Sequence, residues 1–134
     1  MTEGVAGLRL LVVEDEALVA MLIEDILLDL DCIVIGPVGT VAQALALLRD
    51  EEQIDGALLD VNLGGGERSY PVADALAERE VPFVFVTGYG EAGVERRYAP
   101  VTVLQKPFDP RSLEKVVAND LAETSRRVAG RSRR

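Results

Sequence analysis

The sequence predicts an α/β fold in which helices cover both faces of a five-stranded parallel sheet. Strand-like and helix-like segments alternate five times along the chain, a pattern typical of parallel sheets with right-handed crossovers. The strand-like segments are continuous apolar runs, as expected for a sheet that is buried on both faces. With 134 residues, the chain has about the length of one domain.

The first half of the chain supplies three strands and two helices. We expect the strands at residues 8–13, 32–38 and 54–60. A helix is expected over residues 17–30, because apolar residues recur there at helical spacing. They are Leu18, Met21, Leu22, Ile26 and Leu30. Thr40 is a suitable N-cap for a second helix over residues 41–51.

The second half supplies two strands and two clear helices. We expect helices over residues 72–79 and 110–126, and strands over 83–86 and 101–104. Asp109 followed by Pro110 is a typical start for the last helix. Three glycines lie at or near residues 91–98, so a short or disordered fourth helix is expected there. The domain is expected to span residues 7–126, followed by a basic flexible tail at 127–134.

Composition restricts the class of protein and its location. Cys32 is the single cysteine and lies in an apolar stretch. We therefore expect a buried free thiol, no internal disulfide and a reducing, cytoplasmic environment. The first residues do not resemble a signal peptide, and no apolar run approaches the ~18 residues of a membrane helix. The absence of histidine removes a common general base and zinc ligand.

The charge is negative and unevenly distributed. The net charge is −9, yet five arginines lie within residues 126–134 and the first 125 residues carry −14. Such an acidic body repels phosphates, so nucleic acid binding by the domain is not expected. The basic tail could bind nucleic acid or a membrane weakly, although a solvated tail is the simpler interpretation.

Polar residues end four of the expected strands. Glu14 and Asp15 follow the first, Asp60 ends the third, Thr87 follows the fourth, and Lys106 lies just beyond the fifth. In open parallel sheets, ligands bind at the carboxyl ends of strands. The three carboxylates suit Mg²⁺, while the hydroxyl and the ammonium suit phosphoryl oxygens. A carboxylate placed like Asp60 can act as a nucleophile and form an aspartyl-phosphate.

Four motifs resemble the receiver domain of bacterial two-component response regulators. They are LVVEDE at 11–16, LLDVN at 58–62, VTG at 86–88 and KPF at 106–108. The resemblance covers about residues 7–126 and implies a flavodoxin-like sheet of strand order 2-1-3-4-5. It also implies a single-domain response regulator, whose partner would be a sensor histidine kinase or a histidine phosphotransferase.

The resemblance assigns roles to individual residues. Asp60 would accept the phosphoryl group, and Thr87 and Lys106 would contact it. The cofactor Mg²⁺ would be held by Glu14, Asp15, Asp60 and the backbone carbonyl of Asn62. Output would pass through contacts with a downstream protein, with a homodimer as an open possibility.

A narrower resemblance connects the chain to the FAT GUY receivers of alphaproteobacteria. It rests on DVNLGGG at 60–66, SYPVA at 69–73 and PFVFVTGYG at 82–90. The aromatic residue that usually acts as a switch on the fifth strand is replaced by Val103 here. Tyr89 is a candidate substitute, and we expect phosphorylation to order residues 88–98.

Two alternatives use the same residues differently. A small phosphohydrolase with an aspartyl nucleophile would need a second aspartate two positions later, where this chain has Asn62. A protein interaction module with a receiver fold would work without phosphate, and the complete set of acceptor residues argues against it.

Overall fold

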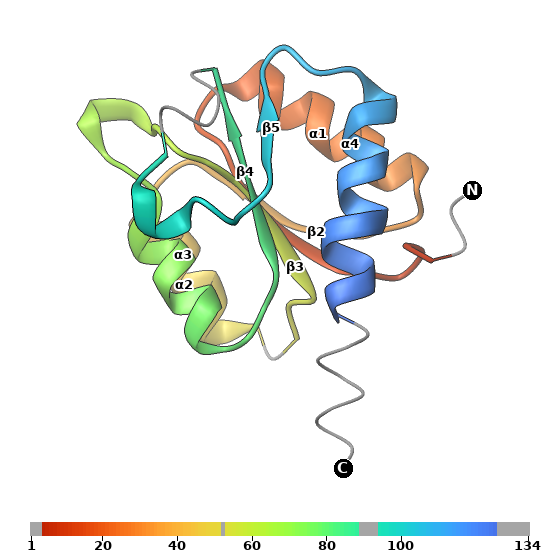
Figure 1. Cartoon of the computed structure of the whole chain (residues 1–134), viewed down its shortest axis with the longest axis horizontal. Helices are drawn as coiled ribbons and strands as arrows, with labels where there is room; N and C mark the ends of the chain where they lie inside the picture. Colours follow the sequence, from red (N-terminus) through yellow and green to blue (C-terminus); the bar gives the residue numbers. More distant parts are fainter. Residues whose placement is uncertain (1–3, 52, 89–93, 126–134) are drawn as a thin grey trace.

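The computed structural model describes residues 4–51, 53–88 and 94–125. Its centre is a five-stranded sheet of order β2-β1-β3-β4-β5 in which every pair of neighbours is parallel (Figure 1). The strands are β1 (Arg9–Val13), β2 (Ile33–Val38), β3 (Gly56–Asp60), β4 (Phe83–Thr87) and β5 (Val103–Gln105). The predicted fold class and strand order are therefore confirmed.

Within the described residues, four α-helices connect the strands or follow them. They are α1 (Ala17–Asp29), α2 (Val41–Asp50), α3 (Tyr70–Glu78) and α4 (Pro110–Val116), which the π-helical η4 (Val117–Ala122) continues. Thr40 accepts a hydrogen bond from the Gln43 backbone N–H at 3.1 Å. Asp109 accepts one from the Ser112 backbone N–H at 2.7 Å. The predicted N-cap Thr40 is thus confirmed, and Asp109 caps the helix whose start was predicted at Asp109 and Pro110.

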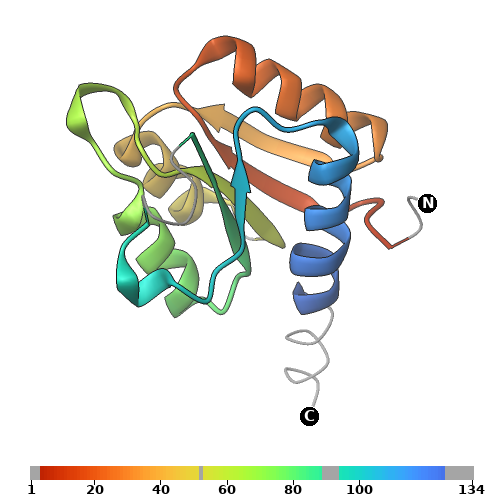
Figure 2. The ribbon, with the colours of Figure 1, turned by 45° about the horizontal axis from the view of Figure 1, so that its top comes forward.

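Helices cover both faces of the sheet (Figure 2), and one hydrophobic cluster lies on each face. On one face, α1 and α4 with η4 pack against Leu10, Val12, Leu58, Val84 and Val86. On the other face, α2 and α3 pack against Leu11, Val13, Ala57, Leu59 and Phe85. Alternate residues of each strand therefore enter opposite clusters, which explains the continuous apolar runs of the sequence. Cys32 is buried at 4% exposure, as predicted.

The predicted buried face of α1 is wrong in part. Leu18, Met21 and Leu22 are 81%, 57% and 43% exposed. Ala20, Ile23, Ile26 and Leu27 are the residues of α1 that are buried. Apolar residues occur on several sides of this helix, so their spacing fits more than one stripe. Asp25 and Asp29 follow Leu18 and Leu22 at helical spacing and mark that face as the solvent side.

Several element boundaries also differ from prediction. The fifth strand begins at Val103 rather than at residue 101, and the third helix begins at Tyr70 rather than at residue 72. Between β4 and β5, the described residues form one short 3₁₀-helix, η3 (Arg96–Tyr98). Tyr89 and the basic tail lie outside the described residues. No helix in the described ranges is long and apolar enough to cross a membrane.

Candidate functional site

The site lies where the carboxyl ends of β1, β3, β4 and β5 meet. Register places Asp60 of β3 beside Val86 of β4. The Lys106 backbone N–H donates to the Thr87 carbonyl oxygen at 2.8 Å, which continues the pairing of β4 and β5. A pocket of about 430 Å³ opens at this edge. Its lining residues are Glu16, Asp60, Asn62, Thr87, Gly88 and Lys106.

Three carboxylates converge beside the pocket. Glu14, Asp15 and Asp60 each place an oxygen within 4.8 Å of the other two. Glu14 and Asp60 are buried, whereas Asp15 is exposed. Hard oxygen donors with one side open to water fit Mg²⁺, which keeps several water ligands when proteins bind it. The donor set therefore suits the predicted metal.

Burial changes the protonation of one of these carboxylates. Glu14 is 3% exposed, and burial, followed by a hydrogen bond with Asp60, raises its pKa to about 7. The ion pair with Lys106 acts in the opposite direction. The ionised form of Glu14 destabilises the folded state, because a charged group loses solvation when it is buried. That cost is expected of a residue retained for binding.

Lys106 is the cation at the centre of the site. Its Nζ lies 2.8 Å from Glu14 Oε1, 3.0 Å from Glu16 Oε1 and 3.2 Å from Asp60 Oδ2. Burial alone would lower the pKa of Lys106, but its partners Glu14 and Glu16 outweigh that effect and hold the pKa above the ordinary value. The ammonium therefore stays charged and partly offsets the acidic groups around it.

Backbone contacts fix the neighbouring loops. The Asn62 backbone N–H donates to Asp60 Oδ1 at 3.3 Å, which orients the carboxylate. A Cβ atom at Gly39 would lie 3.3 Å from the Asp15 Cα, and one at Gly64 would lie 3.2 Å from Asp15 Oδ2. Glycine at these two positions therefore allows the loops to approach Asp15 closely.

The structure brings together Glu14, Asp15, Asp60, Thr87 and Lys106, as the sequence predicted. Asn62 lines the same pocket. Sequence reasoning missed Glu16, which lines the pocket and pairs with Lys106. The signal available was its position directly after two predicted metal ligands. Its partner lies 90 residues later, so only the fold could identify the contact.

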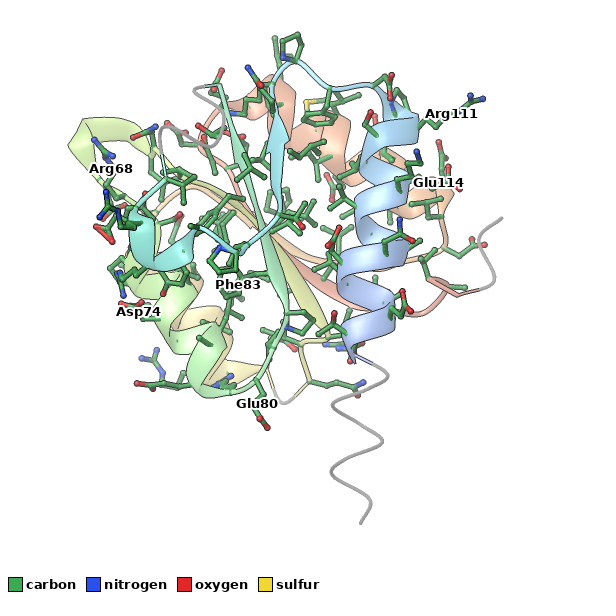
Figure 3. The ribbon with its side chains drawn as sticks, in the orientation of Figure 1. Arg68, Asp74, Glu80, Phe83, Arg111 and Glu114 are labelled. Atoms are coloured by element: carbon green, nitrogen blue, oxygen red, sulfur yellow. The ribbon has the colours of Figure 1, made fainter. Side chains whose placement is uncertain are left out.

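A second cluster, of aromatic and charged side chains, connects η3 to α3 on the face of the sheet that α2 and α3 cover. Tyr98 is 9% exposed and stacks on Tyr70 with ring centroids 5.8 Å apart. Its hydroxyl donates a hydrogen bond to Asp74, which lies on α3 (Figure 3). Arg97 pairs with Asp74 at 2.6 Å and lies over the Tyr98 ring. Tyr98 also contacts Phe85 edge-to-face.

These contacts have a bearing on the predicted ordering of residues 88–98. Glu95 donates its backbone N–H to the Tyr70 hydroxyl at 2.9 Å, so the end of this segment is already attached to α3. Val103, at the position of the usual switch aromatic, is half-buried and packs against the same cluster. Ordering by phosphorylation remains a prediction for the earlier part of the segment, and Tyr89 remains an untested candidate.

Comparisons with known proteins identify the family. The response regulator receiver domain matches residues 10–118. The phyllosphere-induced regulator PhyR of Methylorubrum extorquens is 32% identical over 115 residues, which cover 84% of this chain and 43% of that protein. The chain thus spans less than half the length of this relative.

Solved structures give the same result. SdrG from Sphingomonas melonis Fr1 is 50% identical with a TM-score of 0.75, over 86% of this chain and 95% of that one. The response regulator PhyR from Brucella abortus is 28% identical with a TM-score of 0.84, over 99% of this chain and 56% of that one. Receiver domains act in two-component signalling as phosphoacceptors rather than as enzymes. This chain belongs to the response regulator receiver domain family.

Proposed function

We propose that the chain works in a phosphorelay by accepting a phosphoryl group on Asp60. The observation that carries this proposal is the position of the Asp60 carboxylate. It lines an open pocket, lies 3.2 Å from the Lys106 ammonium, and lies within 4.8 Å of carboxylate oxygens of Glu14 and Asp15. A nucleophile, a cation and a candidate metal site therefore face the same space.

The donor would be a phosphohistidine of a sensor histidine kinase or a histidine phosphotransferase. An Asp60 carboxylate oxygen attacks the phosphorus atom, and the bond from phosphorus to the donor imidazole nitrogen breaks. The products are an acyl phosphate on Asp60 and a free imidazole, which takes a proton from solvent. Mg²⁺, when bound, would neutralise charge on the transferring phosphoryl oxygens.

The protein's own residues prepare the reaction. Glu14, Asp15, Asp60 and the Asn62 carbonyl would hold the ion. Lys106 would donate to one phosphoryl oxygen, and the hydroxyl of Thr87, which lines the pocket, would donate to another. The new charge would draw both groups inward, which couples phosphorylation to the loops that follow β4 and β5.

The exposed face of α1 is the proposed contact surface for the donor. Leu18, Met21 and Leu22 are exposed apolar residues on the helix that begins next to the site. Apolar residues grouped on a surface are typical of interaction sites. A downstream protein that recognises the phosphorylated form is proposed in addition, and a homodimer is an alternative means of output.

Labelling with acetyl phosphate tests the proposal. Wild-type protein with Mg²⁺ should take up one phosphoryl group, whereas Asp60→Asn should take up none. Removal of Mg²⁺ by chelation should abolish labelling of the wild type. Equal labelling of the two proteins would refute the assignment of Asp60, and labelling that persists without Mg²⁺ would refute the metal site.

A further inference from the structure

Glu16 has an unusual position for the first residue of a helix. It is the N-cap of α1, where a side chain normally accepts a hydrogen bond from the first turn, yet its side chain makes no such bond. Instead, its Oε1 lies 3.0 Å from Lys106 Nζ. Its backbone N–H donates to Glu14 Oε2 at 3.0 Å, which fixes its position relative to the cluster of carboxylates. The carboxylate therefore points toward the pocket rather than along the helix.

The Lys106 ammonium has three N–H donors and three carboxylate neighbours. A phosphoryl group on Asp60 takes the place of the Asp60 carboxylate and draws the ammonium toward its own oxygens, so the contact with Glu14 or the contact with Glu16 must be released. The side chains of Glu14 and Asp60 are 1% and 5% exposed, whereas that of Glu16 is 62% exposed. Releasing Glu16 costs least, because water solvates an exposed carboxylate after it separates from its partner.

We infer that Glu16 is a positioning residue for Lys106 that opposes phosphoryl binding. It holds the ammonium at the mouth of the pocket before phosphorylation and must release it when the phosphoryl group arrives. This inference rests on the proposed function of Asp60. Glu16 touches neither the acceptor atom nor the incoming group, and it acts through Lys106.

The charge of Glu16 has opposite effects on the two species that bind here. It attracts a divalent cation and repels an anionic phosphoryl group. Its contact with Lys106 adds a second effect, because only the phosphoryl group competes for that ammonium. Neutralising Glu16 should therefore strengthen phosphoryl binding and weaken Mg²⁺ binding. A variant that had lost its folded structure would bind both the phosphoryl group and Mg²⁺ more weakly.

The experiment compares Glu16→Gln and Glu16→Asp with wild type. The first probe is beryllofluoride, a phosphoryl analogue, titrated at saturating Mg²⁺ and followed by fluorine NMR. The second probe is Mg²⁺ alone, measured by calorimetry. Glu78→Gln is the matched control, because Glu78 is an exposed glutamate on α3, outside the residues that line the pocket.

Glu16→Gln should bind beryllofluoride about two- to fivefold more tightly, the range expected for loss of one exposed ion pair, and Mg²⁺ more weakly. Glu16→Asp keeps the charge but shortens the side chain, and aspartate favours the N-cap position. It should tighten beryllofluoride binding while leaving Mg²⁺ binding close to wild type. Glu78→Gln should change neither.

Unchanged or weaker beryllofluoride binding by Glu16→Gln would overturn the inference and leave the proposed function intact. If wild type itself fails to bind beryllofluoride with Mg²⁺ present, the proposed function fails and the inference fails with it. Parallel thermal unfolding confirms that each variant is folded, so a change in affinity reports on the site.

Discussion

At the scale of the residue, the site combines buried charges that are costly for folding and useful for binding. Glu14 shows this most clearly, because burial raises its pKa to about 7. At higher pH the folded protein keeps a poorly solvated carboxylate next to Asp60. The folded-state pKa lies above the ordinary value of 4.5, so this group favours folding at low pH. That contribution is lost as the pH rises through about 7.

Glu14→Gln is predicted to separate stability from metal binding. Glutamine has nearly the same shape without the charge, so at about pH 8 the metal-free variant should be more stable than wild type by roughly 1–3 kcal/mol. Its affinity for Mg²⁺ should fall, because one charged ligand is missing. Thermal unfolding and calorimetric titration measure the two effects. A variant that is less stable and binds Mg²⁺ as tightly as wild type would contradict this account.

Asp74 provides a prediction about pH. The hydrogen bond from Tyr98, followed by contacts with Arg97, holds the pKa of Asp74 below its ordinary value of 3.8. A depressed pKa stabilises the fold above the unfolded-state value and loses that effect as the pH falls through the folded-state value. Asp74→Asn should therefore unfold at a lower temperature than wild type near pH 7, and the difference should shrink below about pH 4. If the difference in unfolding temperature between Asp74→Asn and wild type did not change with pH, the depressed pKa of Asp74 would be refuted.

At the scale of the element, η3 depends on its attachment to α3. Tyr98→Ala should destabilise the fold by about 2–4 kcal/mol, because a buried ring is removed from an aromatic cluster. Tyr98→Phe keeps the ring and loses the hydrogen bond to Asp74, so its cost should be about 0.5–1.5 kcal/mol. Chemical denaturation measures both values. Equal costs for the two variants would show that the ring contributes nothing beyond the hydroxyl.

The exposed face of α1 gives a functional prediction. Leu18→Gln should change the free energy of unfolding by less than about 0.5 kcal/mol, because the side chain is mostly exposed. It should slow phosphotransfer from a cognate histidine kinase while leaving labelling by acetyl phosphate unchanged. Ile23→Ala, on the buried face, should instead destabilise the fold by about 2–5 kcal/mol. If Leu18→Gln left the rate of transfer from the kinase unchanged, the exposed face of α1 would not be the surface that contacts the donor.

At the scale of the whole molecule, the sheet was predictable and the details around it were less so. The strands are apolar runs, and polar residues lie at the carboxyl ends of four of the five, so the sheet and the positions of Asp60, Thr87 and Lys106 could be predicted. The buried face of α1 could not be assigned from spacing, because Leu18 and Leu22 are as apolar as the residues that the fold buries. Only the acidic residues Asp25 and Asp29 distinguish the faces.

Contacts between distant segments were the second kind of feature that the sequence did not predict. The pairing of Glu16 with Lys106 needs the carboxyl ends of β1 and β5 to lie near one another, although β3 and β4 separate these strands in the sheet. The cluster around Tyr98 needs α3 and η3 to meet on one face of the sheet. Neither contact leaves a local pattern in the sequence. Both depend on how the whole chain folds, so the sequence alone did not indicate them.

The central claim is that Asp60 carries the phosphoryl group, and trapping the acyl phosphate tests it most directly. Protein treated with acetyl phosphate and Mg²⁺ is reduced with borohydride, digested and analysed by mass spectrometry. Reduction converts a phosphorylated aspartate to homoserine. We predict homoserine at position 60 and at no other aspartate. Homoserine at another aspartate with Asp60 unmodified would contradict the account.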